Sequence, residues 1–263
     1  MLKLFPTYQN LEKEITQSLE NFSTSGELLV AGKRNIIKLF PVNETLTLNI
    51  KSFKKPFLLN QIIYGYFRKS KAKRSFEYAS ILLEKEIGTP KPIAYKENSS
   101  VIGLLDSYYV CEHIFCDLTY RELVETDYPD GENILRQFVH FTYKMHQNGI
   151  EFKDHTPGNT LIKNNHDGSY HFYLVDLNRM NFHTSMDFAT RMRNLSKITP
   201  KKEMVAIMSN EYAKISNESE AIVFETMWQF TQEFQAKIIR KKNLKKKLKS
   251  RNQPKHRMAL YPI

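Results

Sequence analysis

The sequence predicts an α+β protein built as two lobes, the first small and rich in β-strands and the second mainly helical. Apolar runs at 27–31 and 35–40, separated by the turn residues GKR, indicate two adjacent strands. The next run, 45–51, alternates apolar and polar residues, which is typical of a strand with one buried face. After about residue 115 the pattern becomes mainly helical. We therefore expect a three-stranded meander, one main helix and then a helical lobe.

The first lobe is expected to begin with an amphipathic helix at 7–22, ahead of the three strands. In the third strand Leu46, Leu48 and Ile50 share one face, and Lys51 lies on the opposite, polar face. The apolar face predicts contact with the core of the lobe. The polar face is left available for a site.

A helical zone at about 58–87 follows the meander. Gly88 stands where a helix C-cap is common, and the TPKP segment after it stops the helix. The runs 101–105 and 107–114 indicate two further strands. A long amphipathic helix is then predicted at 131–149, ending at a glycine.

Three more helices are expected to close the chain, at about 186–197, 200–214 and 219–248. The change of character along the chain predicts three segments. They are an N-terminal lobe at 1–112, a helical lobe with a catalytic hairpin at 113–239, and a basic tail at 240–263.

The net charge of +11 is concentrated near the C-terminus, because residues 240–257 carry ten Lys or Arg and no acid. The rest of the chain is close to neutral. Such a run is commonly a solvated helix end. It also fits an anionic membrane surface, which attracts each nearby Lys or Arg by about 1 kcal/mol. The run has no interleaved aromatic residues, so no specific nucleic-acid partner is expected.

No run of about 18 apolar residues appears, so a membrane-spanning helix is not expected. The first residues lack the apolar stretch of a signal peptide. The two cysteines, Cys111 and Cys116, are too few for a disulfide framework or a zinc site. These observations favour a cytoplasmic protein. They leave its oligomeric state open.

Two short apolar segments, FKDHTPGNTLI and LVDLNRM, carry a pattern of polar residues that predicts chemistry. Asp154 and Asn159 lie in the first segment, and Asp176 lies in the second. Asn159 and Asp176 offer the hard oxygen ligands that Mg²⁺ prefers, and Asp154 is then free to accept a proton from a hydroxyl. This is the layout of phosphoryl transfer. Asp and Asn are also ordinary turn residues, so each alone is a weak signal.

Phosphoryl transfer also needs a lysine that holds phosphates, and Lys51 on the polar strand face fits that role. Glu77, on the following helix, is the expected ion-pair partner of Lys51. Lys54 and Lys55 are rivals for Lys51. A solvated lysine and an exposed helix glutamate are the structural alternatives.

The segments IKSFKKP, RKSKAKRSFEYASILLEKEIGTPKPIAY, YYVCEHI, FKDHTPGNTLI and VDLNRMNF together resemble the protein-kinase-like superfamily. The resemblance is nearer to the lipopolysaccharide kinase (Kdo/WaaP) family and extends over about residues 25–200. It implies a bilobal protein-kinase-like fold and an ATP- and Mg²⁺-dependent kinase. The acceptor would be a Kdo or heptose hydroxyl of the lipopolysaccharide inner core on lipid A, at the cytoplasmic face of the inner membrane.

By the same resemblance Lys51 holds phosphates and pairs with Glu77. Asp154 is the base, and Asn159 and Asp176 bind Mg²⁺. The segment 111–114 is the hinge beside adenine. The site residues expected there are Glu112 and Ile114.

The glycine-rich loop of that superfamily is reduced here to Gly32, followed by Lys33 and Arg34. Gly32 allows a tight turn, and the two cations are expected to contact phosphate in place of backbone amides. Lys153 replaces the usual Arg before the catalytic aspartate and is expected near the transferred phosphate. Asn178 stands where the glycine two positions after the metal-binding aspartate is usual.

Two other functions are compatible with these residues. One is a kinase acting on a protein or another small molecule, and the other is a membrane-docked pseudokinase scaffold. His155 is expected on the hairpin surface. A basic patch beside Glu77 is expected to be a solvated helix face, and it consists of Arg68, Lys71, Lys73 and Arg74.

Overall fold

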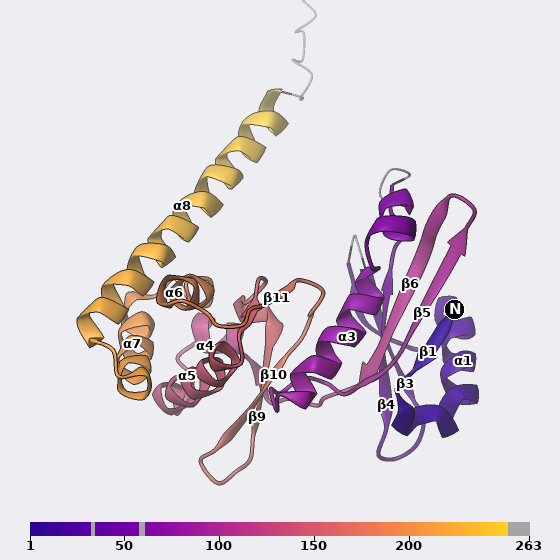
Figure 1. The fold of residues 1–263 in the computed structure, drawn as a ribbon, viewed down its shortest axis with the longest axis horizontal. Helices are drawn as coiled ribbons and strands as arrows, with labels where there is room; N and C mark the ends of the chain where they lie inside the picture. Colours follow the sequence, from indigo (N-terminus) through magenta and orange to yellow (C-terminus); the bar gives the residue numbers. More distant parts are fainter. Residues whose placement is uncertain (33–34, 58–60, 252–263) are drawn as a thin grey trace, which may run out of the picture.

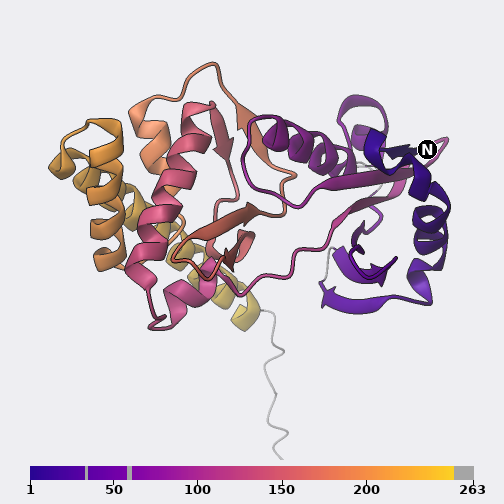
Figure 2. The same cartoon turned by 90° about the horizontal axis from the view of Figure 1, so that it is seen from below.

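The computed structural model describes residues 1–32, 35–57 and 61–251 of the 263-residue chain. A β-rich lobe and a helical lobe lie side by side, which confirms the predicted α+β class (Figure 1; Figure 2). The elements are β1 (Leu2–Leu4), η1 (Pro6–Leu11), α1 (Glu12–Glu20), η2 (Asn21–Ser23), β2 (Glu27–Ala31), β3 (Asn35–Pro41), β4 (Thr47–Phe53), η3 (Ile63–Phe67), α3 (Lys71–Glu84), β5 (Pro92–Ser100), β6 (Gly103–Glu112), β7 (Leu118–Thr119), α4 (Tyr120–Glu125), α5 (Gly131–Gln147), β8 (Ile150–Phe152), η4 (Pro157–Asn159), β9 (Thr160–Asn164), β10 (Tyr170–Leu174), β11 (Met180–Phe182), α6 (Phe188–Leu195), α7 (Lys202–Ser216) and α8 (Glu220–Arg251).

A six-stranded antiparallel sheet forms the first lobe, in the order β1-β5-β6-β4-β3-β2. The alternation predicted for β4 is confirmed. Leu48 and Ile50 are fully buried in the cluster that includes α1. Phe53 packs on the other face, against α3. Lys51 shares that second face, which turns it toward the helical lobe.

The two strands predicted at 101–105 and 107–114 are in fact one strand, β6. Val101 and Ile102 are 94% and 54% exposed, and they form the turn that joins β6 to β5. Strand β5 was not predicted from the sequence, because its outer half is polar. The physical reason is that the β5–β6 hairpin extends past the core, so its far end buries no apolar side chains.

The main helix of the first lobe is shorter than the predicted zone of 58–87, and residues 58–60 lie outside the described part. Ser70 caps α3 by accepting a hydrogen bond from the Lys73 amide. The helix ends at Glu84, and Glu86 takes the positive φ of 52°. Gly88 is therefore not the C-cap. Instead the chain passes close to β10 there, because a Cβ on Gly88 would lie 2.0 Å from the Phe172 carbonyl oxygen.

Backbone hydrogen bonds join the two lobes just after α3. The Leu174 amide donates to the Gly88 carbonyl at 2.9 Å, and the Thr89 hydroxyl donates to the Leu174 carbonyl at 2.9 Å. A shared apolar core lies beside this joint. It combines Ala72 and Phe76 of α3 with residues of the second lobe such as Phe152. Each large side chain buried in this core contributes roughly 1.5–3 kcal/mol.

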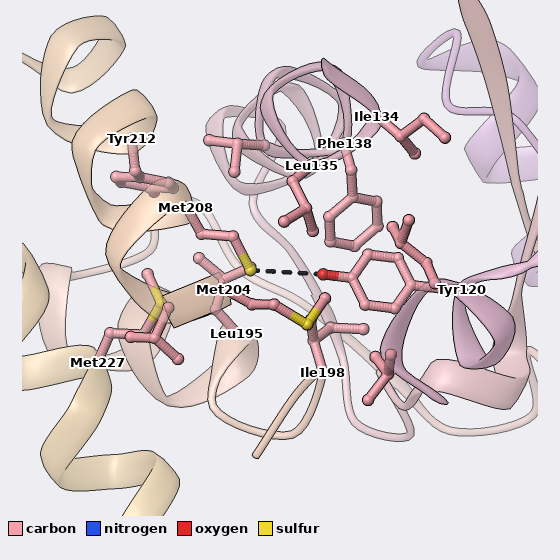
Figure 3. Close-up of a cluster of buried hydrophobic side chains, with 14 of the residues drawn as sticks. Tyr120, Ile134, Leu135, Phe138, Leu195, Ile198, Met204, Met208, Tyr212 and Met227 are labelled. Carbon is pink, nitrogen blue, oxygen red and sulfur yellow. Dashed lines mark hydrogen bonds between the residues drawn. The ribbon is translucent and has the colours of Figure 1, made fainter. Parts of the chain in front are cut away.

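The helical lobe has its own core between α4, α5, α6 and α7, with α8 packed beside them (Figure 3). The Tyr120 hydroxyl is fully buried and donates to Sδ of Met208 at 3.4 Å. The helices predicted at 186–197, 200–214 and 219–248 are confirmed as α6, α7 and α8. Trp228 packs against this core, as expected.

Helix α8 continues well past the helical lobe as a single rod (Figure 1). Its outer part carries the basic run as far as Arg251, and residues 252–257 of that run lie outside the described part. Leu244 and Leu248 are 62% and 59% exposed among these charges. Within residues 1–32, 35–57 and 61–251, no helix combines the length and apolarity needed to cross a bilayer.

Gly149, which ends α5 as predicted, provides a test of this packing. Gly149 and Gly168 both have positive φ, at 69° and 84°. A Cβ on Gly149 would lie 2.0 Å from the His183 carbonyl oxygen, whereas a Cβ on Gly168 meets nothing within 4 Å. We expect Gly168→Ala to cost about 1 kcal/mol, through backbone strain alone. Gly149→Ala should cost about 3 kcal/mol or more, since a backbone carbonyl must also move.

Urea unfolding of the two variants beside the unsubstituted protein measures both losses. The shared positive φ makes Gly168→Ala the matched control for strain. Equal losses of stability in the two variants would contradict the close approach of Gly149 to His183.

Candidate active site

A cavity of about 410 Å³ lies between the two lobes. The sheet supplies Lys51 and the strand that ends at Glu112, and the helical lobe supplies Asn159 and Asp176. Residues far apart in the sequence thus line one space. The lining residues are Leu29, Val30, Asn35, Ile37, Asn49, Lys51, Ser75, Thr89, Pro90, Tyr109, Cys111, Glu112, His113, Ile114, Cys116, Gly158, Asn159, Leu161, Leu174, Val175, Asp176 and Leu177.

Lys51 crosses the space between the lobes. Its Nζ donates to Oδ1 of Asp176 at 2.6 Å, and its side chain is 11% exposed. A buried ammonium needs such a partner, because burying an unpaired charge is costly. Lys54 and Lys55 are exposed and line a different cavity with Phe57. The structure therefore brings Lys51, and neither rival lysine, to the cavity.

The ion pair expected between Lys51 and Glu77 is replaced by two other pairs. Lys51 binds Asp176, and Glu77 binds Lys69 at 2.8 Å. The reason is the rotation of α3 about its axis, which decides which of its side chains face the cavity. Ser75 lines the cavity, and Glu77 follows it by two residues, or about 200° of helix rotation. Glu77 is therefore carried to another side of the helix.

Asp176 has a positive φ of 59°, which aspartate tolerates better than most residues. Its Oδ1 accepts a second hydrogen bond, from Nδ2 of Asn178 at 2.6 Å. Asn178, which stands in place of the usual glycine, thus orients the carboxylate. The Asn178 carbonyl accepts from Nη1 of Arg74 at 2.7 Å. Arg74 is only 7% exposed, so the expectation that it lies on a solvated face is wrong.

Asn159 and Asp154 are held together by the turn between β8 and β9. Nδ2 of Asn159 donates to the Asp154 carbonyl at 2.8 Å. The Asn159 carbonyl accepts from the Val175 amide at 3.0 Å, which ties this turn to the segment that carries Asp176. With its NH₂ group committed, Asn159 keeps a carboxamide oxygen able to act as a ligand.

Asp154 and Lys153 have partners that the sequence did not indicate. Nη1 of Arg179 donates to Oδ1 of Asp154 at 2.9 Å. Nζ of Lys197 donates to the Lys153 carbonyl at 2.7 Å. Arg179 follows Asp176 by three residues, and this closeness in the sequence is a signal that Arg179 lies near the site. Lys197 follows α6, and only the packing of that helix against β8 brings it here.

The segment expected to meet adenine lies at the sheet side of the cavity. Glu112 and Ile114 both line the cavity, and the Glu112 side chain accepts from the Tyr8 hydroxyl. The Glu112 amide donates to the carbonyl of Lys91, the residue before β5. The Gly32 amide donates to the Asn35 carbonyl at 2.9 Å.

Lys33 and Arg34, the cations expected to contact phosphate, lie outside the described residues. The two cysteines are free, and Cys111 is buried in the cavity wall. Burial raises the pKa of the Cys111 thiol to about 12. Cys111 is therefore an uncharged part of the wall.

His155 is fully buried, so its predicted place on the hairpin surface is wrong. Its Nδ1 lies 3.1 Å from Oδ1 of Asn194, and Nε2 of His146 lies 3.2 Å from the same oxygen. Nδ2 of Asn194 donates to the Phe152 carbonyl at 2.8 Å. Asn194 therefore joins two buried histidines to the strand that leads to Asp154. Burial lowers the pKa of His155 to about 4 and that of His146 to about 3.

Asp176 and Asn159 present oxygen atoms of the kind that bind a magnesium ion. Among the described residues no group of three or more His, Cys, Asp or Glu side chains is arranged to hold a metal. Asp176 and Asn159 together offer one carboxylate and one carboxamide. Mg²⁺ typically takes one or two carboxylates and completes its shell with water and substrate phosphates. This pair of residues suits such an ion.

Comparison with known proteins shows the fold. No protein-family model matches the sequence, and no curated protein sequence matches it. A solved structure of WaaP in complex with acyl carrier protein matches with a TM-score of 0.59 at 14% identity, over 89% of this chain and 98% of that chain. This likeness confirms the bilobal protein-kinase-like fold expected from the sequence.

The buried histidines predict how stability depends on pH. An unfolded histidine takes up a proton near pH 6.5. His155 and His146 do so only near pH 4 and 3 when folded, because burial lowers their pKa. Protons therefore favour the unfolded state below pH 6.5. We expect each histidine to remove about 1.4 kcal/mol of stability per pH unit as the pH falls from about 6 to 5.

Urea unfolding between pH 7 and 5 measures this slope. His146→Gln should remove about half of the slope that the two buried histidines produce, because glutamine carries no titrating group. His171→Gln is the matched control, since His171 is exposed. The prediction is wrong if all three proteins lose stability with the same slope.

Proposed function

We propose that this chain is an ATP- and Mg²⁺-dependent phosphotransferase that phosphorylates a sugar hydroxyl of the lipopolysaccharide inner core. The acceptor is Kdo or a heptose attached to lipid A. The proposal is supported by the cavity between the lobes, by the kinase-like fold and by the resemblance of the catalytic segments to lipopolysaccharide kinases.

One observation carries the proposal more than any other. Lys51, Asn159 and Asp176 come from three separate segments, and all three line one cavity. The backbone carbonyl of Asp154 accepts a hydrogen bond from Nδ2 of Asn159. If these residues only capped local turns, they would have no reason to meet. Their convergence supports a shared chemical role.

Each residue has a role that follows from its chemistry. Asp154 accepts the proton of the acceptor hydroxyl. Asn159 and Asp176 supply oxygen atoms to magnesium, and Lys51 supplies a positive charge to phosphates. Mg-ATP, when bound, supplies the phosphoryl group. The 2.6 Å ion pair between Lys51 and Asp176 supports these roles, because it keeps a cation and a carboxylate side by side in the cavity.

The basic end of α8 suggests where the protein works. The helix carries the run from Arg240 outward, away from the rest of the lobe (Figure 1). We propose that this end binds the anionic surface of the inner membrane from the cytoplasmic side. A lipid-anchored acceptor would then be available to the site.

The catalytic role of Asp154 gives a direct test. Asp154→Asn keeps the size of the side chain and removes its ability to accept a proton. We expect transfer of labelled γ-phosphate from Mg-ATP to Kdo-lipid A, or to a heptose-extended form, to fall by about 10²–10⁴-fold. Asp127→Asn is the matched control, because Asp127 is an exposed carboxylate in a loop. Its activity should stay unchanged.

The outcomes of this assay separate the candidate functions. Label on one lipid acceptor, lost only in Asp154→Asn, supports the sugar kinase and identifies its substrate. Label only on proteins or other small molecules moves the activity to another acceptor. Binding of neither ATP nor acceptor, with vesicle binding intact, would leave the scaffold as the better account.

The membrane proposal is tested with the lysines at 241, 242, 245 and 246 of α8. Replacing all four by glutamine should weaken binding to phosphatidylglycerol vesicles by about 1 kcal/mol for each charge at low salt. Vesicles of phosphatidylcholine are the control and should bind neither protein well. Equal binding of both proteins to anionic vesicles would show that α8 is not the contact.

A further inference from the structure

Arg179 touches the proposed catalytic base, although no role was predicted for it from the sequence. Its Nη1 donates to Oδ1 of Asp154 at 2.9 Å. Both ends of this pair are open to solvent, with the arginine side chain 59% exposed and the aspartate side chain 31% exposed. The contact lies at the place where an acceptor hydroxyl has to approach Asp154.

The backbone of Arg179 is fixed, but its guanidinium is not. Strand β11 pairs with β8 through Met180 and Phe152, and the Arg179 carbonyl accepts from the Lys153 amide at 3.1 Å. These bonds hold residue 179 beside the catalytic turn. The long, exposed side chain can still reach other groups around that point, because Asp154 is its sole ion-pair partner among the described residues.

The surroundings of Arg179 carry more positive than negative charge. Lys153 has no ion-pair partner in the described part of the chain. Burial lowers the pKa of Lys197, and repulsion from Arg179 and Lys153 contributes to this, while Glu151 and Asp154 raise it. Three cations therefore face two carboxylates. Glu151 already accepts two hydrogen bonds from the segment of β11.

An exposed ion pair of this kind contributes little to stability, so Arg179 can exchange its partner at small cost. A guanidinium binds carboxylates and phosphates through two parallel hydrogen bonds. An anion on the acceptor would therefore compete well with the single hydrogen bond to Asp154. Such an exchange would also release Oδ1 of Asp154 for the hydroxyl proton.

We propose that Arg179 is an acceptor-binding residue that leaves Asp154 for an anionic group, a carboxylate or a phosphate, carried by the sugar acceptor. The proposal rests on the proposed function, because it gives Asp154 the role of base. It adds a substrate requirement, namely a negative charge near the reacting hydroxyl. It also predicts that Asp154 and the acceptor anion compete for one guanidinium.

Binding of small sugars tests the competition without any phosphoryl transfer. We would titrate the protein with Kdo, mannose 6-phosphate and neutral mannose, and follow binding by NMR. Arg179→Met should weaken binding of an anionic sugar by about tenfold or more, and Arg179→Lys should weaken it less. Asp154→Asn should tighten binding severalfold, because it frees Arg179. Lys144→Met is the control, since Lys144 forms a surface ion pair of 2.8 Å with Glu86 elsewhere.

The double variant Asp154→Asn/Arg179→Met makes the test specific. If the two groups compete, removing Asp154 gains nothing once Arg179 is absent, so the double variant should bind like Arg179→Met. The two anionic sugars show whether a carboxylate or a phosphate is preferred. Mannose should bind all variants equally.

Several results would overturn the proposal. They are unchanged binding in Arg179→Met, unchanged binding in Asp154→Asn, and failure of both anionic sugars to bind better than mannose. The result of the phosphoryl-transfer assay is independent of these sugar-binding results. If an anionic sugar binds through Arg179 but no label is transferred, the kinase proposal is rejected and the anion site remains. If label is transferred but binding of the anionic sugar does not depend on Arg179, only the role of Arg179 is rejected.

Discussion

The backbone joint between the segment after α3 and strand β10 is the constraint on which the site depends. Two hydrogen bonds connect Gly88 and Thr89 to Leu174, and Gly88 approaches β10 so closely that no side chain fits there. Asp176 follows Leu174 by two residues. The joint therefore fixes the position of Asp176 relative to the sheet. The ion pair between Lys51 and Asp176 then connects the two lobes directly.

An uncharged hydrogen-bond network supports the turn between β8 and β9, which carries Asp154. Asn194 uses its oxygen for two buried histidines and its NH₂ group for the Phe152 carbonyl. Burial keeps both histidines neutral. The network therefore positions the turn without adding a positive charge that would pair with the Asp154 carboxylate. The charged groups are on the other side, where solvent and an acceptor can reach them. The fold thus separates structural hydrogen bonding from the proposed chemistry.

The charges around the cavity are also divided by role. On the sheet side a single buried lysine faces carboxylate and carboxamide oxygens, which suits phosphate and magnesium together. On the outer side Arg179, Lys153 and Lys197 surround Asp154, which suits an anionic acceptor. The basic end of α8 would bring the molecule to an anionic surface. The basic end of α8 lies on an element of its own, whereas Asp176 and Arg179 share the loop between β10 and β11.

The sequence alone determined the fold class, the alternating face of β4 and the C-terminal helices, and it singled out Lys51, Asn159 and Asp176, which line one cavity. These depend on local periodicity and on residue chemistry, which a single chain displays directly. It missed β5, because a hairpin that extends beyond the core has no apolar pattern. It also placed Gly88 and His155 wrongly, because their roles come from close approach and burial by distant segments.

Only the tertiary structure decided which charges meet. Lys51 was identified from its strand, but its partner proved to be Asp176 rather than Glu77, because the phase of α3 is set by packing. Arg179 and Lys197 reach the turn that carries Asp154, the first through strand pairing and the second through the packing of α6. Ion pairs form between side chains brought together in space, and their energy depends on distance and burial. Neither quantity is contained in the order of residues along the chain.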